Sequence, residues 1–238
     1  MFARHLALAT LCAAALGAAS AAYADAPASA PAPTFEPEHA GLFMVNVRIT
    51  DVIPTDGQTI WSHTTVTTGG STGDPTTDSG LRTGISQSVV PTLGLTYFVT
   101  DSIAAELILG TSYHQISAVP AAGGASVAVR DQWVLPPTLS LQYHFLPKSQ
   151  ISPYLGVGPT LMLFYAGNNL NGFTTRLGNG FGLSLEAGAD IDISQHASIN
   201  LDLKKIFFST DATINGGSLT SHVNLDPWVP SVGVGWKF

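Results

Sequence analysis

Apolar and polar residues alternate along eight segments of this sequence. In the first segment, residues 42–53, Val47 and the apolar residues two positions away alternate with polar residues such as Arg48. Because successive side chains of a β-strand point to opposite faces, this pattern predicts a strand with one apolar and one polar face. Between Lys205 and Phe208 the alternation is less regular, which favours a β-bulge there. The other seven segments are residues 89–99, 103–114, 133–145, 153–165, 181–193, 198–209 and 228–238.

The connections between these segments alternate in length. Four are long and rich in glycine, serine, threonine and asparagine, whereas three are short. Bacterial outer-membrane barrels have an even number of strands, short periplasmic turns and longer outer loops. The pattern therefore predicts an all-β fold, an eight-stranded antiparallel up-and-down transmembrane β-barrel with short periplasmic turns and longer extracellular loops. The long connections are residues 54–86, 115–131, 166–179 and 210–222, and the short ones are 100–102, 146–152 and 194–197.

Prolines are the main irregularity of the predicted strands. A proline has no backbone N–H, so each one removes a hydrogen bond from a β-ladder. We expect strand ends or bulges to accommodate them. The prolines within or beside predicted strands are Pro91, Pro136, Pro137, Pro153 and Pro159.

Composition indicates that the barrel lies in a membrane. Only 11% of the residues are charged and the mean hydropathy is +0.26, whereas about 25% of the residues of soluble domains are charged. After residue 24 no segment has the ~20 consecutive apolar residues of a membrane-spanning helix. Because backbone groups in hydrocarbon need internal hydrogen-bond partners, a closed barrel is the membrane-spanning structure that remains.

A soluble, lipocalin-like barrel is the alternative all-β interpretation. Such a barrel would place polar residues outside and apolar residues inside. Here the larger apolar and aromatic residues share one face of the strands, and charged residues occupy the other. Charged side chains pair and hydrate more readily in a polar lumen than against lipid. The sequence therefore predicts a polar network in the lumen, formed by Arg48, Glu106, Glu186, Asp190, Asp202 and Lys204.

The N-terminus has the pattern of a secretion signal. A short basic start precedes an apolar run, and residues 22–24 (Ala-Tyr-Ala) resemble a signal-peptidase site. We therefore expect residues 1–24 to be a cleaved signal peptide. Residues 25–40 are rich in proline and alanine and predict a disordered periplasmic lead-in. Residues 41–238 would then form the barrel in the cell outer membrane.

Charge and cysteine content bear on nucleic-acid binding, disulfides and metal sites. The sequence has 9 Lys and Arg against 16 Asp and Glu, and one of the basic residues, Arg4, lies in the expected signal peptide. An acidic chain without a Lys/Arg cluster argues against nucleic acid as a partner. The only cysteine, Cys12, also lies in the expected signal peptide. The barrel would therefore have no thiol for a disulfide or a metal site.

Five segments, taken in order, resemble the OmpW family of small outer-membrane proteins. The last of them reads LDPWVPSVGVGWKF, and each alone would be a weak match. The resemblance covers about residues 41–238 and implies an eight-stranded barrel with a narrow interior, associated with uptake of small hydrophobic molecules. The five segments are residues 93–107, 135–145, 153–160, 201–206 and 225–238.

The chain departs from the usual family pattern at two prolines. Pro159 and Pro230 stand where the family commonly has other residues, so we expect the local strand geometry to differ there. Independently of the family, Phe238 ends a strand of alternating aromatic and apolar residues. This ending resembles the C-terminal signal of outer-membrane barrels, so we expect the barrel-assembly machinery to bind it.

No catalytic or metal-binding pattern stands out, and we predict neither an enzyme nor a cofactor. Ser112 and His114 come nearest to a nucleophile and base, but two positions along a strand span about 6.5–7 Å, beyond hydrogen-bond reach. Several acidic residues could suggest a calcium site, but basic residues on the same face favour a structural ion-pair network. These acidic residues are Glu186, Asp190, Asp192 and Asp202.

The predicted function rests on the inward positions near the outer rim. An apolar upper lumen above a charged floor would admit small hydrophobic molecules, which would leave sideways into the bilayer. An eight-stranded barrel is filled by its own side chains, so porin-like conduction of water is not expected. The apolar lumen positions, which we expect to contact the ligand, are Val52, Ile108, Val134, Met162 and Phe164.

The alternative function is that of a structural or adhesive surface protein. Such a protein would act through its outer loops, of which residues 54–86 form the longest. A transporter needs an apolar cavity of solute size, whereas an adhesin does not. In either case outer-membrane lipid and lipopolysaccharide would surround the barrel.

Overall fold

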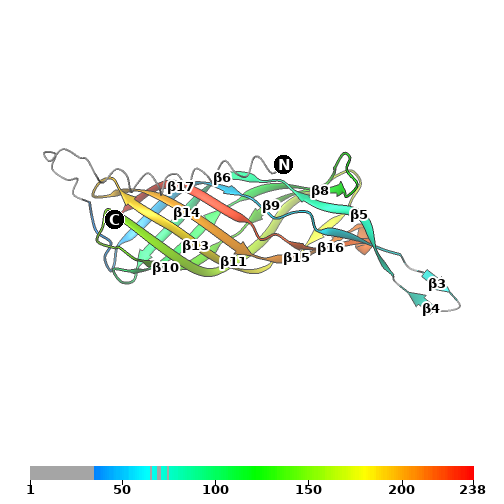
Figure 1. Cartoon of the computed structure of the whole chain (residues 1–238), viewed down its shortest axis with the longest axis horizontal. Helices are drawn as coiled ribbons and strands as arrows, with labels where there is room; N and C mark the ends of the chain where they lie inside the picture. The colour runs from blue at the N-terminus through cyan, green and yellow to red at the C-terminus, as the bar shows by residue number, and fades with distance from the viewer. Residues whose placement is uncertain (1–34, 65, 69–70, 74) are drawn as a thin grey trace.

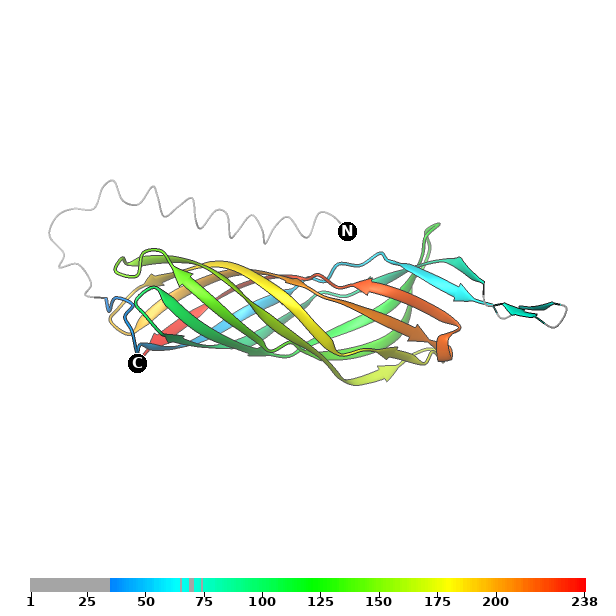
Figure 2. The same ribbon diagram turned by 90° about the horizontal axis from the view of Figure 1, so that it is seen from below.

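The chain forms a closed eight-stranded antiparallel β-barrel (Figures 1 and 2). The computed structural model describes residues 35–64, 66–68, 71–73 and 75–238. The expected signal peptide and residues 25–34 of the expected lead-in lie outside these residues. No helix of the described part is long and apolar enough to cross a membrane.

Eight strands form the closed ring. β1 pairs with β17, and β10 pairs with β11, so that no edge is left open in this ring. Closure satisfies the backbone groups that an open edge would leave without partners. In order along the chain the strands are β1 (Phe43–Val52), β6 (Ser88–Phe98), β7 (Ile103–Gly110), β10 (Thr138–His144), β11 (Ile151–Asn169), β13 (Gly180–Asp192), β14 (Ala197–Phe207) and β17 (Trp228–Lys237).

Most of the predicted long connections are extended strand. They continue the barrel wall beyond the ring at the right-hand end of Figure 1, called here the long-loop end. Composition suggested loops, but threonine suits strands and neighbouring segments satisfy one another's backbone groups. The added strands are β2 (Thr59–His63), β5 (Thr76–Ile85), β8 (Ser112–Pro120), β9 (Val127–Leu135), β12 (Thr175–Leu177), β15 (Ser209–Ile214) and β16 (Leu219–Asn224). At the tip lie the hairpin β3 (Val66–Thr68) and β4 (Ser71–Gly73), and a 3-10 turn, η1 (Asn215–Gly217), joins β15 to β16.

The two faces of the strands follow the predicted alternation. Leu141 is 56% exposed on the outside, whereas its neighbour Gln142 is 2% exposed and points inward. Large apolar side chains cover the outside of the ring, and most buried polar side chains face the lumen. This arrangement is the reverse of a soluble barrel and matches a wall that faces lipid.

Aromatic side chains gather at two levels on the outside. Near the C-terminus, Phe43 contacts Phe238 with ring centroids 6.2 Å apart. Farther toward the long-loop end, Tyr113 and Trp133 lie 5.1 Å apart. Aromatic girdles of this kind mark the two interfaces of a membrane-spanning barrel.

The predicted bulge at residues 205–208 was wrong. The register of β14 with β13 and β17 is continuous, and the inward parity of Lys204 extends to Ile206 and Phe208. Lys205 therefore points outward, 4.9 Å from the ring centroid of Trp228. The sequence looked irregular because a lysine occupies a lipid-side position. There the ammonium group of Lys205 lies over the Trp228 ring and donates a hydrogen bond to the backbone carbonyl of Asp226.

The expected lead-in includes residues 35–40, which lie against the barrel at the short-turn end, where the C-terminus lies (Figure 1). Glu38 is 2% exposed, and its backbone N–H donates to the carbonyl of Pro147 at 2.8 Å. The Glu38 carboxylate lies 3.1 Å from Nδ1 of His144 inside the barrel. Glu38 packs here because its buried carboxylate has a partner in the lumen, which composition alone could not reveal.

Candidate functional site

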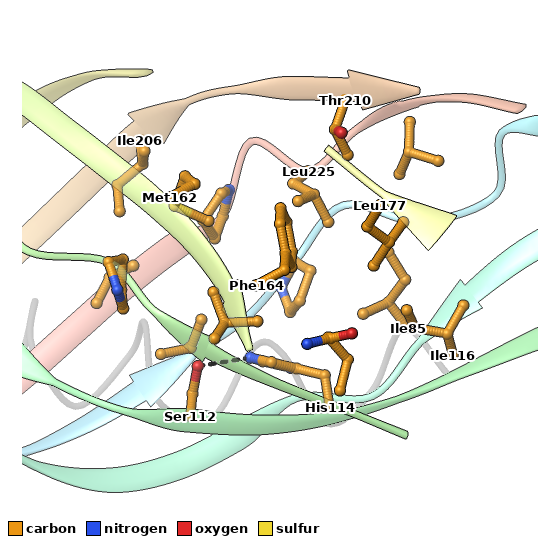
Figure 3. Close-up of a pocket in the computed structure, with 18 of the residues that line it drawn as sticks. Ile85, Ser112, His114, Ile116, Met162, Phe164, Leu177, Ile206, Thr210 and Leu225 are labelled. Carbon is orange, nitrogen blue, oxygen red and sulfur yellow. Dashed lines mark hydrogen bonds between the residues drawn. The ribbon is translucent and has the colours of Figure 1, made fainter. Parts of the chain in front are cut away.

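A long cavity occupies the part of the lumen toward the long-loop end (Figure 3). Its empty space is about 1380 Å³, including the part open to solvent. Its wall combines residues from the membrane-spanning ring and from the strand extensions. All five apolar positions expected from the sequence line this one cavity, namely Val52, Ile108, Val134, Met162 and Phe164.

Two apolar clusters contribute residues to the cavity wall. In the lower cluster, Val134 and Met162 pack with Ile206 and Phe208, and Phe164 packs against them. The upper cluster, closer to the long-loop end, is formed by Ile60, Ala118 and Val129. Figure 3 shows Met162, Phe164 and Ile206 projecting into the space that they line. The cavity can therefore surround an apolar solute along most of its length.

Hydroxyl groups lie between the apolar wall and the charged floor. Thr50 and Thr92 share a hydrogen bond of 2.7 Å, and both line the cavity. On another part of the wall, Thr138 and Thr160 share one of 2.8 Å. In each pair the hydroxyls of neighbouring strands hydrogen-bond each other. These bonds allow the hydroxyls to be buried next to the apolar wall.

The expectation that Ser112 and His114 are too far apart to bond was wrong. Nε2 of His114 lies 2.8 Å from Oγ of Ser112, and Nδ1 lies 2.6 Å from the carbonyl oxygen of Ser86. The strand rise separates the two Cα atoms, but the long imidazole side chain spans that distance along the same face. Both residues line the cavity and are almost fully buried.

Buried charges close the floor of the cavity. Arg48 donates to Oε1 of Glu106 at 2.5 Å and to Oδ1 of Asn200 at 2.6 Å. Gln142 donates at 2.9 Å to Glu106 and also at 2.9 Å to Glu186. These side chains are at most 4% exposed, so the polar network fills the lumen.

The remaining charged positions join the same network. Lys204 forms ion pairs with Glu186 and Asp202. The hydroxyl of Tyr154 donates to Asp202 at 3.2 Å and accepts from Asn200 at 3.1 Å. Asn200 also donates to Asp190 at 2.9 Å. The structure thus brings together all six polar positions expected from the sequence, although their role remains a prediction.

The acidic residues do not gather as a calcium site would require. Asp192 pairs with Lys237 at 2.8 Å, near the C-terminus. A different group, Glu38, His144 and Asp190, places one potential ligand atom each within 4.8 Å of the others. His144 already contacts Glu38, and Asp190 already accepts from Asn200. We therefore assign this group to the hydrogen-bonded floor.

The β-ladder of the barrel wall is interrupted beside the cavity. Ser112 pairs with Val134, and Ile108 pairs with Thr138, in one continuous register. Within the described residues no ladder pair joins residues 109–111 to residues 135–137, the segment here called the seam. Pro136 and Pro137 cannot donate to the ladder.

The seam lies directly at the cavity, because Gly110, Thr111 and Pro136 are among the lining residues. Thr111 donates to the carbonyl of Val134 at 3.2 Å and also hydrogen-bonds the hydroxyl of Tyr165. The other prolines of concern each pair with a residue of one neighbouring strand, but the ladder also skips two positions beside Pro159, between residues 139–140 and 158–159, and two beside Pro230, between residues 51–52 and 229–230. These prolines are Pro91, Pro153, Pro159 and Pro230.

Comparison with known proteins identifies the family. Residues 39–238 match the OmpW family over their whole length. This chain belongs to the OmpW family. The outer-membrane protein y4mB of Sinorhizobium fredii is 38% identical over 237 residues, covering 95% of this chain and 96% of that protein. Outer membrane protein W of Salmonella typhi is 31% identical over 156 residues, covering 61% of this chain and 71% of the relative.

A solved structure agrees with the fold of this OmpW-family barrel. The crystal structure of the outer membrane protein OprG from Pseudomonas aeruginosa superimposes with a TM-score of 0.72 at 27% identity. The match covers 86% of this chain and 99% of OprG. The protein is therefore an outer-membrane barrel, and its short-turn and long-loop ends correspond to the periplasmic and extracellular sides.

OmpW-family barrels are not known as enzymes. The hydrogen bond between Ser112 and His114 does not by itself make a hydrolase, because acyl transfer also requires donors for the developing oxyanion. In this family member the pair is better considered as part of the cavity wall.

The sequence pattern missed several residues of the site. Ile206, which lines the cavity, and Phe208, which packs in the same cluster, could have been found, because they continue the inward parity of Lys204. Tyr154 was missed because a large aromatic residue suggests the lipid face, yet it is 2% exposed in the lumen. Glu38 carries no sequence signal of its own, since only the folded barrel brings it to His144.

Proposed function

We propose that this OmpW-family barrel admits small hydrophobic molecules from outside the cell into the cavity and releases them sideways into the bilayer. The observation that carries the proposal is the cavity lined by Ile108, Met162 and Phe164. The cavity ends on a floor of buried ion pairs, and beside it the β-ladder of the barrel wall is interrupted at the seam.

The apolar wall supplies the driving force for entry. A solute that leaves water gains roughly 25 cal/mol for each Å² of apolar surface that is buried. Val134, Met162 and Ile206 pack together and line the cavity, so they provide such a surface. Entry would need no specific polar contact, which suits alkane-like and arene-like solutes.

The floor makes direct passage to the periplasm unfavourable. A solute moving past Arg48 and Glu106 would separate an ion pair whose side chains are at most 2% exposed. Breaking a buried pair leaves an uncompensated charge in a low-dielectric interior. Passage through the seam requires no such step, because its three strand pairs are already missing and Pro136 and Pro137 cannot form them.

Charges placed in the cavity wall test this proposal. Ile108→Asp and Met162→Asp should each lower the initial rate of uptake of radiolabelled octane several-fold. An apolar solute that binds next to the new carboxylate would displace its water and offer no hydrogen bond in return, which costs free energy. Ile108→Val serves as the matched control and should retain uptake. Heat-modifiable migration in SDS would verify assembly of each variant. Unchanged octane uptake in both assembled Asp variants would overturn the proposal.

A loop excision separates transport from adhesion. His63 pairs with Thr76, so residues 64–75 can be replaced by a two-residue Asn-Gly turn without cutting the β2–β5 ladder. Uptake should persist after this change, because the excised tip lies beyond the cavity. The adhesive alternative predicts the opposite pattern, in which the excision abolishes surface binding and the Asp substitutions have no effect.

A further inference from the structure

One polar group in the cavity wall has a defined hydrogen-bonding direction. Nδ1 of His114 contacts the carbonyl oxygen of Ser86 at 2.6 Å, and Nε2 contacts Oγ of Ser112 at 2.8 Å. Figure 3 shows the Ser112–His114 bond on the wall below Phe164 in that view, with Met162, Ile206 and Leu225 above it. A polar pair thus faces apolar side chains across the cavity.

The direction follows from counting donors and acceptors. A carbonyl oxygen only accepts, so the contact with Ser86 places a proton on Nδ1 of His114. Neither ring nitrogen contacts a carboxylate in these bonds, and burial in an apolar wall favours the neutral imidazole. Nε2 is then an acceptor, and the hydroxyl of Ser112 donates its hydrogen to it.

Ser112 therefore has no hydrogen left for a solute, but its oxygen retains lone pairs. If a solute acceptor took the Ser112 hydrogen, Nε2 of His114 would be left buried without a partner. A solute with its own donor avoids this cost, because it can donate to Ser112 while the His114 bond remains intact. The Ser112–His114 pair thus favours a solute that carries a hydrogen-bond donor over one that carries only an acceptor.

We propose that Ser112 and His114 form a hydrogen-bond-accepting subsite for the hydroxyl group of an otherwise apolar solute, such as an alkanol or a phenol. This inference rests on the proposed function, since the solute must first enter the cavity. The hydrocarbon part lies against Met162, Phe164 and Ile206, and the hydroxyl donates to Oγ of Ser112. An ether or ester of the same size lacks the donor.

Three probes of equal size test the subsite. 1-Octanol, 1-methoxyheptane and nonane have the same number of heavy atoms but differ in hydrogen-bond capacity. Affinities are obtained by NMR titration of the full barrel in detergent micelles and referred to partitioning into protein-free micelles. We expect octanol to bind about three- to tenfold more tightly than methoxyheptane, the range of one net hydrogen bond.

Three variants test whether Ser112 and His114 cause the preference for octanol over methoxyheptane. In His114→Phe the Ser112 hydrogen becomes free for a solute acceptor, so the preference for octanol should fall toward one while nonane still binds. In Ser112→Ala, Nε2 of His114 is open to the solute hydroxyl, so the preference should remain. Thr92→Val is the control, because it removes another cavity hydroxyl and leaves the Ser112–His114 bond in place.

The outcomes separate this inference from the proposed function. Equal affinity for octanol and methoxyheptane in the wild-type protein, with nonane bound, would overturn the subsite and leave hydrophobic uptake standing. A preference that persists in His114→Phe or disappears in Thr92→Val would also overturn it. If none of the three probes binds the wild-type barrel, both the subsite and the proposed uptake are wrong.

Discussion

Arg48 and Glu106 form a buried ion pair across the lumen, with Nη2 and Oε1 2.5 Å apart. Their strands, β1 and β7, do not pair directly, since β6 lies between them in the ring. The pair therefore ties together parts of the wall that the β-ladders do not join, and it forms the centre of the floor beneath the cavity.

Removing the cation should destabilise the barrel more than removing both charges. Arg48→Met leaves the Glu106 carboxylate buried without its main partner, which costs about 3–5 kcal/mol. The temperature at which the SDS-resistant form converts to the slower-migrating form should fall clearly. Arg48→Met combined with Glu106→Gln should recover much of the loss. Equal behaviour of the single and double variants would contradict a dominant role for the charge pair.

Neighbouring substitutions on β10 should have opposite consequences. Leu141→Arg places a cation on the lipid face, where it costs about 2–4 kcal/mol near the bilayer midplane and impairs insertion. Gln142→Arg places the cation beside Glu106 and Glu186 and should be milder. The fraction of heat-modifiable protein in outer membranes measures both. Similar losses would show that the assigned orientation of β10 is wrong.

Locking the seam should slow release into the bilayer. The register places Thr111 opposite Leu135, so Thr111→Cys with Leu135→Cys should form a disulfide across the seam. Oxidation should lower octane uptake several-fold, and reduction should restore it. The matched control is Leu107→Cys with Leu139→Cys, a pair in the intact ladder between β7 and β10. If oxidation leaves uptake unchanged in both pairs, the solute does not leave through the seam.

A glycine where β11 approaches β10 should resist substitution. A Cβ atom at Gly158 would overlap the backbone carbonyl of Leu139, because β10 and β11 approach closely there. Gly158→Ala should therefore destabilise the barrel by about 1–3 kcal/mol through overpacking. At Gly178 the nearest atom to such a Cβ is 3.4 Å away, so Gly178→Ala should be tolerated. A lower conversion temperature in SDS for Gly178→Ala alone would contradict this explanation.

The sequence alone determined the fold and the two faces of the wall. Alternation with a period of two is a local property, so the outward position of Leu141 and the inward position of Gln142 follow from the residue order. The same alternation placed Ile108 and Met162 in the upper lumen and Lys204 in the floor. Low charge content and family-like segments then assigned the barrel to the outer membrane.

The tertiary structure decided which side chains meet. Arg48 and Asn200 are 152 positions apart, and their contact depends on the combined register of the strands around the barrel. The seam likewise arises only when the prolines of one strand lie opposite residues 109–111 of its neighbour. The Ser112–His114 bond depends on side-chain rotamers, and the burial of Glu38 depends on a closed floor. Periodicity determines which face a residue occupies, whereas its partners are set by register and by the packing of the whole lumen.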